Sequence, residues 1–132
     1  MKRLLILLQL TLYATGLSAV MAQDRQEIFV DRIKFRLERV SDNELENEYF
    51  VTLRFNKGTS YKFRVTNNQE NLPGKAVFEV LDQNNAVITN VLNDKYFENI
   101  NFVCNKTGFY DILVKYQDGK PGYSLIDIFM LQ

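Results

Sequence analysis

Few residues in this sequence have the types and spacing that catalysis requires. Its 132 residues include no histidine and one cysteine, Cys104, so no imidazole is available to activate a serine or cysteine nucleophile. The same absence argues against the usual histidine-containing zinc and copper sites. The chain has no Gly-x-Ser-x-Gly turn, Ser-x-x-Lys motif or glycine-rich phosphate loop, although a serine–lysine pair remains formally open. We therefore expect a protein that has no catalytic residues, needs no cofactor and is not an enzyme.

The acidic residues offer two other kinds of chemistry. The densest acidic cluster consists of Asp42, Glu44, Glu46 and Glu48. Carboxylate oxygens can hold a calcium ion, but this run lacks the glycine-containing ligand loop of an EF-hand and is also typical of a solvated connection. A glycosidase needs two carboxyl groups held across one bond, and the candidates are Glu79, Glu98, Asp111 and Asp127. Their spacing singles out no pair of catalytic carboxyl groups. Metal binding by the acidic run stays an open alternative.

Aromatic side chains could form a binding surface. Five of them flank the ends of predicted strands: Tyr49, Phe50, Tyr96, Phe97 and Tyr123. If they are exposed together, they form a patch for a protein partner or a glycan. The alternative is that they line the inner face of a second sheet.

The charge balance bears on the class of partner. The chain has 16 basic and 16 acidic residues and a sequence pI of about 6.3. Basic and aromatic residues alternate in residues 61–64, but alternation places them on opposite faces of a strand. We expect no nucleic-acid binding, because no excess of positive charge is present.

The first 22 residues have the three-part layout of a secretory signal peptide. Lys2 and Arg3 precede an apolar run over residues 4–12, and small residues lead to Ala22. The run is short for a membrane span, which needs about 20 apolar residues. We expect cleavage after Ala22, with an uncleaved signal anchor as the alternative. Residues 23–132 would then form one exported domain without a transmembrane segment.

Period-two alternation in the rest of the chain predicts strands separated by turns at roughly 8–12-residue intervals. The firmest strands are residues 49–55 and 61–65, and further strands are expected at 76–80, 86–91, 96–104, 109–116 and 123–131. Residues 27–40 fit a strand or a helix, and we favour the strand. The predicted fold is an all-β antiparallel sandwich, jelly-roll-like, with seven or eight strands. The expected inward residues are Val51, Leu53, Phe55, Phe63, Val65, Phe78, Val80, Ile100, Phe102, Ile112 and Val114.

Five residues are expected to have structural roles. Gly58 supplies the glycine of a tight hairpin between the strands 49–55 and 61–65, the second of which begins at Tyr61. Gly108 can adopt a positive φ in the turn that precedes the strand 109–116. Tyr110 can hydrogen-bond a neighbouring backbone group and lock that corner. Cys104 is interpreted as a buried small hydrophobe, with an intermolecular disulfide as the alternative.

Three segments resemble a known family. They are residues 57–63 (KGTSYKF), 74–82 (GKAVFEVLD) and 102–110 (FVCNKTGFY), together with the closing turn 118–122 (DGKPG). The chain resembles secreted bacterial β-sandwich domains of the pre-peptidase C-terminal kind and, more loosely, the Golgi-dynamics (GOLD) sandwich. The resemblance covers residues 49–131 and implies an accessory role without catalytic residues. It also implies the periplasm or the cell surface of a Gram-negative bacterium, although no peptidase is attached here.

Together these observations predict an exported, non-enzymatic interaction module. It would bind a protein or an envelope component through a sheet face or an edge strand. The alternative is a small accessory domain that binds a glycan or calcium through the aromatic patch or the acidic run. The sequence does not predict the oligomeric state.

Overall fold

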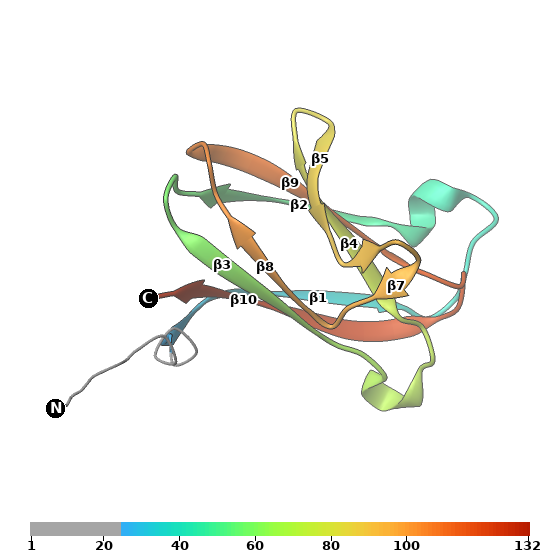
Figure 1. Cartoon of the computed structure of the whole chain (residues 1–132). Coiled ribbons are helices and arrows are strands. Elements are labelled where there is room, and N and C mark those ends of the chain that lie inside the picture. Colours follow the sequence, from blue (N-terminus) through green and yellow to red (C-terminus); the bar gives the residue numbers. More distant parts are fainter. Residues whose placement is uncertain (1–24) are drawn as a thin grey trace, which may run out of the picture.

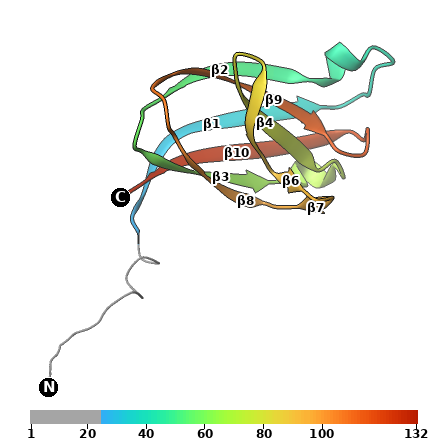
Figure 2. The same cartoon turned by 45° about the horizontal axis from the view of Figure 1, so that its top comes forward.

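The computed structural model describes residues 25–132. Two four-stranded antiparallel sheets face each other, and their strands run roughly along the same axis (Figures 1 and 2). The predicted all-β sandwich is therefore confirmed. The predicted signal peptide, residues 1–22, lies outside the described residues. Within residues 25–132 no helix is long and apolar enough to cross a membrane.

The first sheet, sheet A, has the strand order β1-β10-β3-β8. Its strands are β1 (Glu27–Leu37), β10 (Gly122–Leu131), β3 (Ser60–Thr66) and β8 (Asn99–Val103). The second, sheet B, has the order β2-β9-β4-β5. Its strands are β2 (Tyr49–Phe55), β9 (Gly108–Tyr116), β4 (Ala76–Asp82) and β5 (Asn85–Thr89). This is the double Greek key of a jelly roll, in which almost every connection crosses between the sheets.

Three short elements complete the described chain. A hairpin of two-residue strands, β6 (Val91–Leu92) and β7 (Lys95–Tyr96), joins β5 to β8, and two 3₁₀ helices lie in loops, η3 (Glu44–Asn47) and η4 (Gln69–Asn71). Positive φ at both central residues of a two-residue turn matches the right-handed twist of hairpin strands. Gln83 and Asn84 have such φ values (50° and 73°), as do Asn93 and Asp94 (52° and 63°). These turns account for the tight β4–β5 and β6–β7 hairpins.

The core lies between the two sheets and follows the alternation of the strands. Phe63 of β3 and Phe78 of β4 are fully buried and stack with 5.0 Å between ring centroids. Of the expected inward residues, Val51, Leu53 and Ile100 are only partly buried, because each lies on an edge strand. The others are buried.

Residues 27–37 form a strand, as favoured, and β10 lies between β1 and β3, as its apolar sequence suggested. The predicted hairpin between β2 and β3 is wrong, because these strands belong to different sheets. Gly58 has the expected positive φ (84°), but its N–H donates to the carbonyl of Cys104, so the loop pairs with the end of β8. Gly108 has no positive φ and simply begins β9.

Candidate functional site

The five aromatic residues expected to flank strand ends lie on separate parts of the molecule. Phe50 points outward from sheet B, where it pairs with Leu113. Tyr123 lies on the outer side of sheet A, beneath the guanidinium of Arg36 at 4.9 Å from the ring centroid. Tyr49 stacks on Phe35 of the opposite sheet, with 6.0 Å between ring centroids.

The remaining two aromatic residues belong to the β6–β7 end of the sandwich. The hydroxyl of Tyr96 donates to the carbonyl of Ala76 at 2.8 Å, and the backbone N–H of Phe97 donates to the carbonyl of Asn90. Burial raises the pKa of the Tyr96 hydroxyl. The five residues therefore do not come together as one patch.

Three of the residues expected to be structural meet at the opposite end. Cys104 is a buried free thiol. Its sulfur and the hydroxyl of Tyr110 both donate to the carbonyl of Lys106. Burial raises the pKa of Tyr110 to about 12. The hydroxyl of Tyr61, buried nearby, accepts from the backbone N–H of Asn56 at 2.9 Å.

The acidic run lies in the loop that carries η3. The side chain of Asn43 caps this helix by accepting from the backbone N–H of Leu45, and the hydroxyl of Ser41 donates to Glu46 at 2.6 Å. Its four acids are Asp42, Glu44, Glu46 and Glu48. Among residues 25–132, no three histidine, cysteine or acidic side chains come together as a metal-binding group.

The outer face of sheet A carries several ion pairs. Arg32 of β1 binds Asp127 of β10 with two hydrogen bonds, of 2.6 and 3.1 Å. The carboxylate of Glu27 accepts from Lys62 at 2.8 Å and from Arg64 at 3.0 Å. The hydrogen bond from Lys62 lowers the pKa of Glu27. The charged groups of this face are thus largely bound to one another.

Further ion pairs lie near the C-terminal end of β1. Arg36 donates to Glu38 at 2.7 Å and to both carboxylate oxygens of Glu70. These hydrogen bonds raise the pKa of Arg36, and those that it donates to Glu70 have the largest effect. The same contact lowers the pKa of Glu70. The η4 loop therefore closes onto the edge of sheet A.

The outer face of sheet B is different. Phe50 and Phe109 are among the most exposed apolar side chains of the described chain, at 57% and 68%. The strand register places Leu113 beside Phe50 and places Arg54 beside Phe109, with the Arg54 guanidinium 5.9 Å from the ring centroid. These side chains form what we call the sheet B face, which consists of Phe50, Arg54, Leu81, Phe109 and Leu113.

The charges around the sheet B face have no ion pair within residues 25–132. Glu79 lies beside Leu113, and Asp111 beside Leu81. Asp111 accepts a hydrogen bond of 2.6 Å from the hydroxyl of Thr52, and neither acid reaches a basic group. Asp111 lies in the row between the Phe50–Leu113 pair and the Arg54–Phe109 pair, so exposed apolar side chains alternate with unpaired charges on this face. Apolar and polar groups are mixed in this way in protein interfaces.

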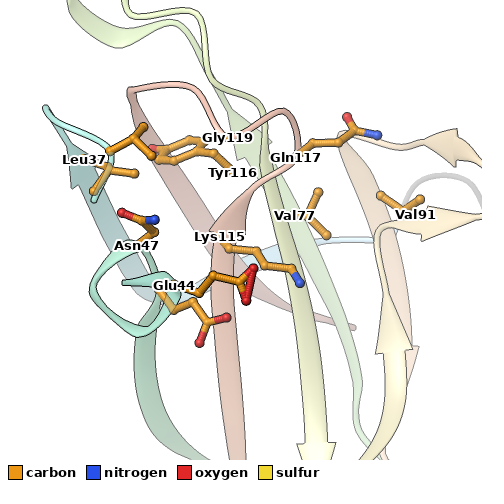
Figure 3. A pocket seen from close by; sticks show the side chains of 11 residues that line it. Leu37, Glu44, Asn47, Val77, Val91, Lys115, Tyr116, Gln117 and Gly119 are labelled. Atoms are coloured by element: carbon orange, nitrogen blue, oxygen red, sulfur yellow. The ribbon is translucent and has the colours of Figure 1, made fainter. Parts of the chain in front are cut away.

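A cavity of about 430 Å³ lies at one end of the sheet B face. Lys115 of β9 and Val77 of β4 form its floor, and η3 forms one wall (Figure 3). Figure 3 shows Lys115 between the turn that carries Glu44 and the strand that carries Val77. Within the described part of the chain, Lys115, Glu44 and Glu48 have no ion pair. The cavity therefore combines apolar walls with three charged groups that a partner could bind.

Sequence reasoning found Phe50 but missed Phe109, Leu113 and the cavity. The sequence does contain a signal for Phe109 and Leu113. Both are apolar residues at outward positions of a strand whose inward positions are also apolar, and Leu81 is a third such residue. The cavity had no such signal, since its walls come from five separate segments.

No protein-family model matches this chain, and no curated protein matches it. Among solved structures, the chain is similar to PliG of Aeromonas hydrophila, described as a periplasmic inhibitor of g-type lysozyme. The two share 14% identity at a TM-score of 0.49, over 82% of this chain and 89% of PliG. The resemblance to pre-peptidase C-terminal and Golgi-dynamics domains stays a prediction.

Proposed function

We propose that this protein is an exported, non-enzymatic module that binds a protein or a proteinaceous component of the cell envelope through the sheet B face. One observation carries the proposal. Phe50 and Phe109 are both exposed on a face whose charges form no ion pair among residues 25–132. The opposite face also exposes an aromatic residue, Phe29, but its charges are largely bound to one another. Export rests on the signal-peptide pattern of residues 1–22.

The chemistry of the face favours a protein over a small polar ligand. Aromatic and arginine side chains supply most of the binding energy in protein interfaces, especially where neighbouring residues exclude water. Phe50, Phe109 and Arg54 are of these types. Leu113 lies beside Phe50, and Leu81 lies beside Asp111 on the next strand. The charged residues Glu79 and Asp111, the second of which lies between Leu113 and Phe109 on β9, would set the orientation of the partner.

The cavity would receive one side chain of that partner. Two carboxylates, Glu44 and Glu48, and one ammonium, Lys115, line it together with apolar walls. One carboxylate remains in excess when the other pairs with Lys115. An arginine or lysine suits such a site, because its aliphatic stem packs on apolar walls while its charge meets a carboxylate.

Site-specific photocrosslinking in the producing cells tests the proposal. A benzophenone analogue of phenylalanine replaces Phe109, and in a matched protein it replaces Phe29, which is 56% exposed but lies on β1 of sheet A. We expect one protein, identified by mass spectrometry, to be captured from position 109 and not from position 29. Crosslinked products of twice the chain's own mass contain two copies of this chain and are not counted as capture of a partner.

The purified partner then permits a binding measurement. Phe50→Glu should weaken its affinity by about tenfold or more, because an exposed aromatic contact of the face is replaced by a charge. Phe29→Glu should leave the affinity unchanged. Equal capture from positions 29 and 109, or an affinity that Phe50→Glu does not alter, would overturn the proposal.

A further inference from the structure

The sandwich has four edge strands, and β2 is the one without protection. Native proteins shield edge strands by shortening them, by bulges or by charged side chains, since an open edge pairs readily with another strand. Strand β1 has a bulge between Phe29 and Asp31 and a row of charges, and β5 and β8 have five residues each. Strand β2 has seven residues in unbroken register and one charge, Arg54.

The open edge of β2 exposes apolar groups on both sides. Among the described strands β2 pairs with β9 alone and lies at the margin of sheet B (Figure 2). On its outer side Phe50 is exposed. On its inner side Val51 and Leu53 face the core but stay half-buried, whereas Phe78 and Val80 on the interior strand β4 are fully buried. A strand added at this edge would cover both sides.

We propose that a second copy of this chain occupies the edge, with the two β2 strands paired antiparallel about Thr52. This register pairs all seven residues of β2, and it is self-complementary, as a two-fold interface requires. Phe50 meets Arg54 of the second copy, and Val51 meets Leu53. Thr52 meets its own copy. No like charges face each other, and each guanidinium lies between Phe109 of its own chain and Phe50 of the other.

The dimer would contain one continuous eight-stranded sheet, with the two sheet B faces side by side. This inference goes beyond the proposed function, because it concerns self-association and holds whether or not a different protein binds the face. Two copies of the face would also bind a repetitive partner with higher avidity.

Disulfide trapping tests the register. In an antiparallel pair, facing Cβ atoms lie about 4.5–5.5 Å apart. Cysteines at position 52 would therefore meet, whereas cysteines at position 54 would lie about 14 Å from each other along the strands. We expect Thr52→Cys to form a covalent dimer under mild oxidation. Arg54→Cys, on the same side of the same strand, should not, and neither should the native chain, whose Cys104 is buried.

Charge substitutions at one position separate this inference from the proposed function. Phe50→Arg places two arginines opposite each other at both symmetry-related pairs, and it should weaken the dimer by about tenfold or more in sedimentation equilibrium. Phe50→Glu pairs with Arg54 instead and should preserve the dimer. Phe50→Arg combined with Arg54→Glu should restore it. Both single variants remove the aromatic ring, so both should lose a partner bound to the sheet B face.

The outcomes differ for the two proposals. A native chain that stays monomeric at all concentrations, or equal trapping from positions 52 and 54, would overturn self-association and leave binding by the face intact. A trapped dimer whose position 109 captures no other protein would support self-association and overturn the proposed function.

Discussion

The backbone N–H of Phe78 donates to the side-chain oxygen of Asn90 at 2.8 Å, at the point where β5 has ended and no longer supplies a carbonyl. The same amide donates to the carbonyls of Ala76 and Phe97, both at 3.1 Å. Asn90 is fully buried, and one side chain thus satisfies three backbone groups. It holds β4 to the segment that leads into β8.

Asn90→Ala should therefore destabilise the protein strongly. Each buried backbone group left without a partner costs about 1–3 kcal/mol. Asn101→Ala, on the exposed side of β8, removes an amide of the same size without a buried partner and serves as the control. Urea denaturation measures both variants, and similar midpoints would contradict the role assigned to Asn90.

Phe63→Ala should cost about 3–5 kcal/mol in the free energy of unfolding, because it removes a fully buried ring and leaves a cavity against Phe78. Phe109→Ala removes the same atoms from an exposed position and should change stability by less than about 0.5 kcal/mol. Thermal melts of the two variants make the comparison. A Phe63→Ala melt that matches the native one would show that the core is placed incorrectly.

Gly122→Ala should destabilise the fold even though the φ of Gly122 is not positive. An added Cβ would lie within 3.0 Å of three ring atoms of Tyr116. That ring cannot yield easily, because its hydroxyl donates to the carbonyl of Phe35 at 2.7 Å and it stacks on the Phe35 ring. The expected loss is about 1–3 kcal/mol.

Gly108→Ala is the matched control for Gly122→Ala. Gly108 also begins a strand, but no atom lies within 4 Å of its added Cβ. Its melting temperature should stay close to that of the native protein. An equal loss of stability in the two variants would contradict this explanation. It would mean that glycine is needed at position 122 for its backbone conformation and not because of the Tyr116 ring.

Glu27→Gln should change the stability of the protein at neutral pH and not at acid pH. The hydrogen bond from Lys62 holds the pKa of Glu27 below 4.5. A carboxyl with a lowered pKa in the folded state stabilises the fold above its unfolded pKa, and this contribution is lost as the pH falls through the folded value.

The native protein should thus melt at a higher temperature than Glu27→Gln at about pH 7, and the two melting temperatures should converge as the pH falls through the lowered pKa of Glu27. Calorimetry across this range measures the difference. A difference in melting temperature that stays constant with pH would show that the packing of the Glu27 side chain, and not its charge, is responsible.

Much of the strand pattern could be predicted because alternation reports directly which side chains face the core. Phe63, Phe78 and Ile112 were predicted to be inward on this ground, and all three are fully buried. The β6–β7 hairpin was not predicted, because strands of two residues are too short to show a period. Val51 and Leu53 also have inward parity but stay half-buried, since parity does not distinguish an edge strand from a central one.

The pairing of strands was the least predictable feature. Residues 56–59 join two alternating strands and contain a glycine, which favours a hairpin when only local sequence is considered. In the structure Gly58 instead bonds to Cys104, and β2 and β3 diverge into separate sheets. The partner of each strand depends on contacts between residues far apart in the chain.

The sequence by itself determined that this protein is an all-β sandwich, which residues form most of its core, and that imidazole chemistry is absent, because composition and period-two alternation are local properties. Only the tertiary structure decided which sheet each strand joins, that Phe50 and Phe109 share one face while Tyr123 lies on the other, and that β2 has an open edge. These features depend on long-range strand pairing, which places residues side by side regardless of their distance in sequence.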